Sequence, residues 1–258
     1  MKLKRSAVLA ATATLALCVL AYQLIFSGRA EGVAGEMLDM IITRALGAAI
    51  FGVMLAYLGY RVFSFRASSR RMALLTFLLA LLVAVNNFPI IGLATGKCLL
   101  IQPWYMLVLL AFECLAVSAF EELAFRGVFL LYILENRRKN KGQILLTTAI
   151  ASAVFGLAHL INIVDGASLP SVALQVGYSF LIGGMCAVVL LRTHNILACV
   201  LIHAVYNFGG HLIFRLGTGS LWDTPTVIIT AILGVFALIF MLYSFLTLSV
   251  SDTDKLYP

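Results

Sequence analysis

Hydrophobic residues are arranged along this chain in long uninterrupted runs, and short polar segments separate one run from the next. The apolar runs cover residues 6–26, 38–57, 72–93, 104–134, 143–164, 171–191, 196–214 and 226–248. An α-helix of about 20 residues crosses the roughly 30 Å hydrocarbon core of a bilayer. The pattern therefore predicts an all-α, polytopic membrane helical bundle with about eight transmembrane helices.

Composition supports a membrane environment. Of the 258 residues, 62% are hydrophobic and only 11% are charged, whereas a soluble domain carries about 25% charged residues. A soluble fold of this length cannot keep so much apolar surface away from water, but a bilayer can cover it. No linker or sequence repeat stands out, so we expect one compact bundle without a separate soluble domain.

The net charge of +7 has its origin in short basic clusters between the apolar runs. Alternate loops hold Lys2, Lys4 and Arg5; Arg61, Arg66, Arg70 and Arg71; Arg137, Arg138, Lys139 and Lys141; and Arg192. The opposite loops hold Arg29, Lys97 and Arg215. By the positive-inside rule, both termini are expected in the cytoplasm, and the expected location is the inner (plasma) membrane of a bacterium. The charge then orients the protein in lipid, and no nucleic-acid partner is expected.

The first apolar run follows three basic residues, as in a secretory signal. It continues to Phe26 without a clear A-x-A cleavage site, so we interpret it as an uncleaved signal anchor. The five cysteines form no CxxC pair, and four of them lie within apolar runs. They are expected to pack as small apolar residues, and a disulfide framework or a zinc knuckle is not expected.

Several ionisable or polar residues interrupt the apolar runs at membrane depth, where a charged side chain costs several kcal/mol unless it faces the protein interior or water. They are Glu121, Glu122, Arg126, His159, His203 and Asn207. Counting helix rise from the predicted cytoplasmic ends places Glu121 at ~21 Å, His159 at ~24 Å, His203 at ~14 Å and Asn207 at ~20 Å. Three separate helices thus bring polar groups to one depth, as in a site built inside a bundle.

The spacing of these residues suggests their chemistry. Glu122 and Arg126 are four apart and are expected to pair on one helix face. Glu121 points about 100° away, so it remains free to act as a general base, with His159 as a second proton-handling group. His203 and Asn207, also four apart, offer two donors for a developing oxyanion. No GxSxG or HExxH motif is present, which leaves an activated water as the attacking group.

The same three motifs resemble the CPBP family, the CAAX proteases and bacteriocin-processing proteins, also called Abi. The family pattern of EExxxR, FxxxH and HxxxN corresponds to Glu121-Glu122-xxx-Arg126, Phe155-xxx-His159 and His203-xxx-Asn207. Phe125-Arg126-Gly127 and Asn195 also match, and the resemblance covers about residues 105–214.

The resemblance implies a membrane-embedded endopeptidase. It assigns Glu121 and His159 to water activation, His203 and Asn207 to the oxyanion, and Glu122 and Arg126 to supporting positions. We accordingly divide the chain into three helices without a specific motif (residues 1–102), a catalytic core (103–216), and a last transmembrane helix with a short cytoplasmic tail (217–258).

Three alternatives remain open. The chain can be a non-catalytic immunity factor or scaffold, or a proton-coupled transporter, although no repeat typical of transporters is visible. The third is a zinc protease with His159, His203 and Glu121 as ligands. We nevertheless expect no cofactor. A ligating histidine needs a carboxylate to orient it, and the nearby one, Glu122, is expected to be paired with Arg126. The expected partners are a peptide or membrane-protein substrate and the lipid bilayer. The sequence leaves the substrate and the oligomeric state open.

Four other positions carry weaker expectations. Glu113 lies eight residues before Glu121 and is expected at the outer membrane interface rather than on an access path to the site. His211, four residues after Asn207, is likewise expected at that interface rather than as an extension of the polar stripe. Arg44 is expected to extend outward to the lipid headgroups. Ser179, Gly183 and Ala187 form a small-xxx-small ridge that would let a neighbouring helix approach closely.

Overall fold

The computed structural model describes residues 5–26, 31–64, 66–67, 69–164, 166–220 and 222–258. It is an all-α bundle, as predicted. The helices are α1 (Arg5–Phe26), α2 (Gly32–Leu58), α3 (Arg70–Asn86), α4 (Ile90–Ala94), α5 (Tyr105–Glu122), the π-helix η1 (Leu123–Leu130), α6 (Leu131–Glu135), α7 (Lys141–Ala158), the 3₁₀-helix η2 (His159–Ile163), α8 (Leu169–Thr193), α9 (Ile196–Leu216), α10 (Thr224–Leu246) and α11 (Val250–Asp254). Two short strands, β1 (Leu99–Leu100) and β2 (Gly217–Thr218), pair antiparallel.

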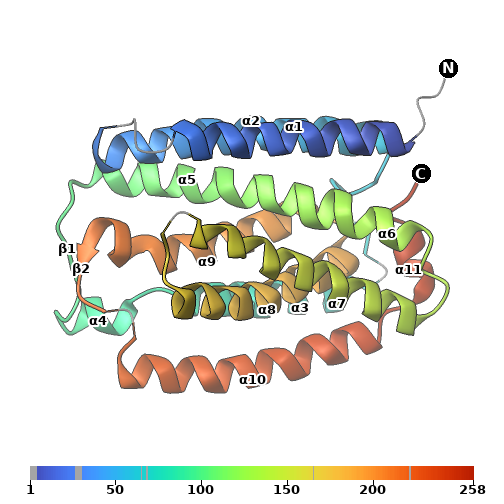
Figure 1. Cartoon of the computed structure of the whole chain (residues 1–258). Helices are drawn as coiled ribbons and strands as arrows, with labels where there is room; N and C mark the ends of the chain where they lie inside the picture. The colour runs from blue at the N-terminus through green and yellow to red at the C-terminus, as the bar shows by residue number, and fades with distance from the viewer. Residues whose placement is uncertain (1–4, 27–30, 65, 68, 165, 221) are drawn as a thin grey trace.

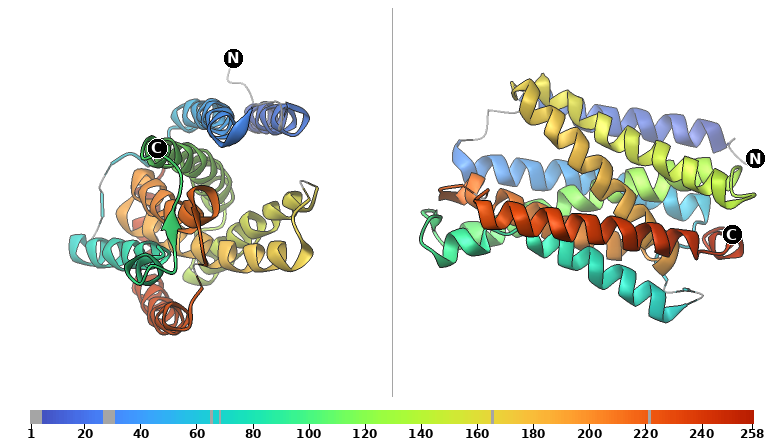
Figure 2. Two further views of the ribbon diagram at one scale, coloured as in Figure 1. Left: turned by 90° about the vertical axis from the view of Figure 1, so that its left-hand side faces the viewer. Right: turned by 90° about the horizontal axis from the view of Figure 1, so that it is seen from below.

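The long helices run nearly parallel to one another (Figure 1). The start of α1, the α6–α7 turn, α11 and the C-terminus lie at one end, which we call the tail end. The β1–β2 pair and α4 lie at the opposite end, which we call the hairpin end. Seen along the bundle, α1 and α2 occupy one edge and α10 the opposite edge (Figure 2). Helix α9 packs against α3, α5 and α8 and therefore holds a central position.

Within the described residues, five helical segments are long and apolar enough to cross a membrane: α2, α7 together with η2, α8, α9 and α10. Helix α3 has only 17 residues. The predicted run 104–134 is divided among α5, η1 and α6, so no single helix covers it. The eight-span count thus stays a prediction, although each apolar run corresponds to a helical segment.

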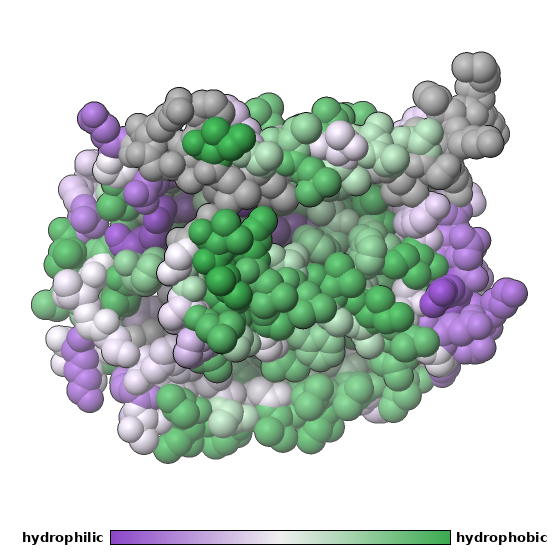
Figure 3. All heavy atoms as spheres, viewed as in Figure 1, coloured by the Kyte–Doolittle hydropathy of each residue, from purple (hydrophilic) through white to green (hydrophobic). Residues whose placement is uncertain are grey.

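The outer surface is strongly apolar between the two ends (Figure 3). Helix α10 shows this best, since Ile232, Val235 and Ile239 are each more than half exposed. Soluble monomers rarely expose contiguous apolar patches of this kind. Hydrophilic atoms gather instead at the tail end and the hairpin end, so the apolar band is the part that lipid would cover.

Basic residues of the alternate loops lie together at the tail end, as the charge pattern predicts. There the Arg138 Nε donates to the Asp254 carboxylate at 2.6 Å, and the Lys141 Nζ donates to the Leu246 carbonyl at 2.7 Å. Lys2, Lys4 and Arg29 lie outside the described residues. The five cysteines are free, and four of them are buried, consistent with the packing role expected for them.

Arg44 differs from its prediction. Instead of extending to the headgroups from the middle of α2, its guanidinium lies 5.1 Å from the centre of the Phe120 ring on α5, with Nε and Nη1 buried. The face of the Phe120 ring therefore takes the place that the prediction gave to the lipid headgroups as the partner of the Arg44 guanidinium.

Candidate active site

The two adjacent glutamates are the last residues of α5, and a π-helix begins immediately after them. Eight-residue π-helices are rare, since π geometry usually occupies a single turn inside an α-helix, and it is frequent at functional sites. Arg126 lies inside η1 and is buried. The wider turn therefore coincides with the segment that carries the first motif.

A buried ionic cluster joins this segment to α9. The Glu122 Oε1 lies 3.1 Å from the Arg126 Nη1, the ion pair that their four-residue spacing predicts. The same oxygen lies 2.8 Å from the His203 Nδ1. Glu122 is fully buried, and both partners are nearly so. A buried carboxylate requires such partners, because its charge has lost the stabilisation that water provides.

Glu121 is the more accessible of the two acids. Its side chain is 19% exposed, whereas that of Glu122 is 0% exposed. Its Oε2 lies 3.6 Å from the His203 Nε2, which is longer than a hydrogen bond. His203 therefore stands between the two carboxylates, bonded to the buried one and facing the accessible one. The ring of Tyr178 on α8 lies 6.2 Å from that of Tyr206 on α9.

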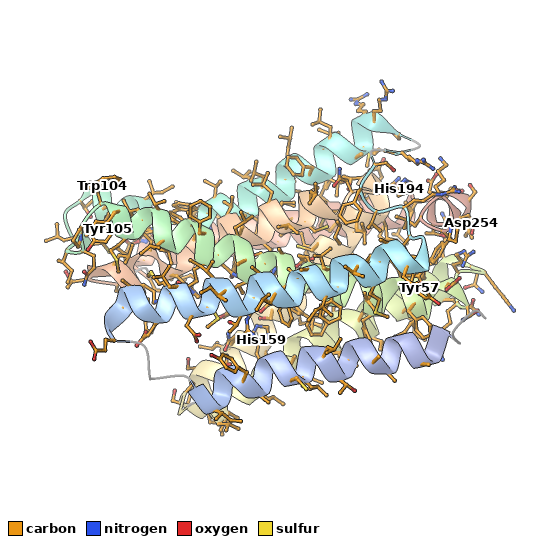
Figure 4. The ribbon with its side chains drawn as sticks, turned by 90° about the horizontal axis from the view of Figure 1, so that it is seen from above. Tyr57, Trp104, Tyr105, His159, His194 and Asp254 are labelled. Carbon is orange, nitrogen blue, oxygen red and sulfur yellow. The ribbon has the colours of Figure 1, made fainter. Side chains whose placement is uncertain are left out.

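His159 is the first residue of η2, directly after the end of α7. Its Nδ1 lies 3.0 Å from the carbonyl oxygen of Phe155, so that nitrogen is oriented by the backbone and Nε2 is directed elsewhere. Figure 4 shows His159 about midway along the bundle, between Trp104 at the hairpin end and His194 at the tail end. His159 therefore lies well away from both ends of the bundle.

The Phe155 ring connects the three motifs. The Arg126 guanidinium lies over it at 4.0 Å from the ring centre, a distance at which a cation–π contact is favourable. The rings of His159 and His203 meet it edge-on at 5.1 Å and 5.9 Å. Phe155 is 2% exposed. Sequence reasoning assigned no role to this side chain, although it is the first residue of the FxxxH pattern and lies one helical turn before the histidine.

Asn207 lies one turn beyond His203 on α9 and is half-buried. Within the described part of the chain, its side-chain amide makes no hydrogen bond to protein. The amide is thus available to a ligand, as an oxyanion donor has to be.

Whether the site could hold a metal ion depends on how closely its ligating side chains approach one another. Among the described residues, no three His, Cys, Asp or Glu side chains are close enough to hold one. Arg126 does not occupy Glu122 alone, because the Glu122 carboxylate also contacts the His203 Nδ1. Both histidines have their Nδ1 oriented by an acceptor, as metal ligands usually do. Zinc therefore has to be tested by measurement.

Small residues of α8 make room for the cluster, as the ridge of Ser179, Gly183 and Ala187 predicts. A Cβ on Gly183 would lie 2.9 Å from the Arg126 Nη2 and 3.1 Å from the Phe155 Cδ1. Gly156 of α7 likewise approaches the backbone of α8, where a Cβ would meet the Val176 oxygen at 2.8 Å. The absence of these side chains is what lets α7 and α8 close around the Arg126–Phe155 stack.

This packing predicts different outcomes for two adjacent glycines. Gly183→Ala should destabilise the protein by about 1–3 kcal/mol, as overpacking does, and should lower activity by displacing Arg126. Gly184→Ala is the matched control, because its Cβ would meet only the Ser152 Oγ at 3.7 Å. It should match or exceed wild-type stability, since alanine favours helix by about 1 kcal/mol. Thermal unfolding in detergent compares the two, and equal unfolding temperatures would contradict the packing role of Gly183.

Comparison with known proteins places these side chains in a family. Residues 102–209 match the family model described as type II CAAX prenyl endopeptidase Rce1-like. No curated protein and no solved structure matches the chain. The matched segment runs from just before α5 into α9. It includes Glu121, Glu122, His159, His203 and Asn207. Residues 102–209, which hold the whole polar cluster, are therefore similar to the CAAX protease (CPBP) family.

Proposed function

We propose that this protein is an intramembrane endopeptidase that hydrolyses a peptide bond of a membrane-associated or lipidated peptide or protein. One observation carries the proposal: a buried Glu122–Arg126–His203 cluster holds His203 against Glu121, an acid that remains accessible. A cluster that only joined helices would have no need of a second, partly exposed carboxylate facing the histidine.

Glu121 is the proposed general base. A water bound beside it would lose a proton to the carboxylate as its oxygen attacks the carbonyl carbon of the scissile peptide bond. His159 would polarise the same water through Nε2, because its Nδ1 is engaged by the Phe155 carbonyl. When the tetrahedral intermediate collapses, the C–N bond breaks and the proton held by Glu121 passes to the leaving amine.

His203 and Asn207 are the proposed oxyanion donors. With Glu122 ionised beside Arg126, the His203 Nδ1 has to be the donor in their hydrogen bond. The His203 Nε2 can then donate to an oxyanion only when both ring nitrogens carry protons. Glu122 is in this scheme a positioning residue, since its contact with Nδ1 fixes the orientation of the His203 ring without contacting substrate.

The name of the matched family, CAAX prenyl endopeptidase, suggests a prenylated C-terminal peptide as one substrate class. A bacteriocin leader, a pheromone precursor or a membrane protein fits the same proposal. A site in the apolar band of the bundle suits any substrate that partitions into lipid.

Comparative peptidomics of cells that carry the wild type or Glu121→Gln tests this function. We expect one or more peptides, or truncated membrane proteins, that appear only with the wild type. If both strains give the same peptides while a cellular phenotype of the gene persists in Glu121→Gln, the proposal is wrong and a non-catalytic scaffold or immunity role replaces it.

We also predict that the reaction is independent of metal. Active, purified protein should contain less than stoichiometric zinc, and prolonged exposure to phenanthroline should leave turnover unchanged. Stoichiometric zinc, with activity lost on chelation and restored by added zinc, would contradict this prediction. It would make Glu121, His159 and His203 ligands rather than proton carriers.

A further inference from the structure

A row of polar residues continues from the site along α9 to the hairpin end. His203, Asn207, His211 and Arg215 follow one another at four-residue spacing, so they project from one side of the helix. On α9, His211 lies one turn before Arg215 and two turns after His203. His211 is exposed, although α9 is a central helix of the bundle. The row thus extends beyond the residues used in the proposed mechanism.

Helices α2 and α5 complete the row at the hairpin end. The Arg215 Nη2 donates to the Glu113 Oε1 and its Nη1 to the Glu36 Oε2, each at 3.2 Å. Glu113 is buried eight residues before Glu121 on α5, and the Glu36 side chain is 51% exposed at the start of α2. Charged and polar groups therefore run without a break from the accessible acid of the site to the surface of the hairpin end.

Two buried polar atoms of this row lack a protein partner, which indicates that water binds there. In the described part of the chain, the Glu113 Oε2 and the Arg215 Nε are buried and have no hydrogen-bond partner in the protein. Buried polar atoms almost always have a partner, and an ordered water is the usual one when protein supplies none. Both atoms belong to residues that form the Arg215–Glu113 ion pair, so water bound to them would lie between the surface and His211.

We propose that this row, from Glu36 through Arg215, Glu113 and His211 to Glu121, is a hydrated path by which water reaches the site from the hairpin end. The inference rests on the proposed function, because hydrolysis consumes one water for each peptide bond inside an otherwise apolar band. The Arg215 ion pairs close the outer part of the path to larger solutes, and the exposed His211 ring lines its middle.

Hydroxyl-radical footprinting of the wild-type protein in lipid nanodiscs tests the path, since these radicals modify side chains that water contacts. His211 should be modified readily. Phe112 is the matched internal control: it is 56% exposed in the bundle and lies beside Glu113 on α5, but points about 100° away from it. Modification of His211 no faster than that of Phe112 would overturn the proposal.

A second measurement follows water to the site. His211→Leu places an apolar side chain across the path and should reduce modification of His203 at least several-fold, whereas Phe112→Leu should leave it unchanged. Equal modification of His203 in both variants would show that water enters elsewhere and would overturn the path. Neither measurement needs proteolysis, so a labelled but inactive protein would contradict the proposed function alone.

Discussion

Glu121→Gln should lower kcat/KM of the purified protein by a factor of about 10²–10⁴, the contribution typical of general-base catalysis. The amide keeps the shape of the carboxylate but cannot accept the proton from water. Folding should be nearly unchanged, since the Glu122–Arg126–His203 cluster does not depend on Glu121 for a hydrogen bond. Cleavage of a quenched fluorescent peptide in detergent or nanodiscs provides the measurement.

Glu31→Gln is the control for this experiment. Glu31 is exposed at the start of α2 and makes no capping hydrogen bond with its side chain, so the same loss of charge there should leave kcat/KM as in the wild type. Turnover of Glu121→Gln within a few-fold of the wild type would remove Glu121 from the role of base.

Arg126→Ala should lower the stability of the fold by about 3 kcal/mol, the lower end of the range for breaking a buried ion pair. The lower end applies because Glu122 keeps His203 as a partner. The variant also loses the guanidinium that covers the Phe155 ring, which links α7 to η1. Thermal unfolding and the yield of folded protein measure the effect.

Asn207→Ala separates stability from catalysis. The Asn207 amide has no hydrogen bond within the described protein, so its removal should leave the unfolding temperature unchanged and lower mainly kcat. Arg126→Lys, which keeps the charge, should recover part of the stability lost in Arg126→Ala. An unfolding temperature of Arg126→Ala equal to that of the wild type would mean that the buried pair contributes nothing to the fold.

Periodicity and spacing were sufficient for part of this structure. Apolar run lengths predict every long helix, because a helix that crosses lipid has to be continuously apolar. Four-residue spacing predicts the Glu122–Arg126 pair. Such local geometry depends only on the helix that carries the residues.

Contacts between helices were harder to predict. The hydrogen bond between Glu122 and His203 joins residues 81 positions apart, and it depends on the rotation of α9 relative to α5. Residues 123–130 contain no proline or other sequence marker of a π-helix, so the change from α to π geometry after Glu122 could not be predicted. The expectation that Glu113 and His211 lie at the outer membrane interface stays a prediction, and the sequence alone did not show that Arg215 pairs with Glu113.

The π-helix has a consequence for comparing sequences. Each π turn takes up more residues than an α turn, so η1 contains an extra residue relative to an uninterrupted helix between Glu122 and Leu131. A relative with a regular α-helix here would align with this chain only if one gap were placed in that interval. Without the gap, its EExxxR motif would match while Leu131 and Leu134, both fully buried here, would be aligned with residues on the wrong helix face. Deleting one residue of this chain between Gly127 and Leu130 would test the same register shift directly, because the glutamates would stay in place while α6 rotates.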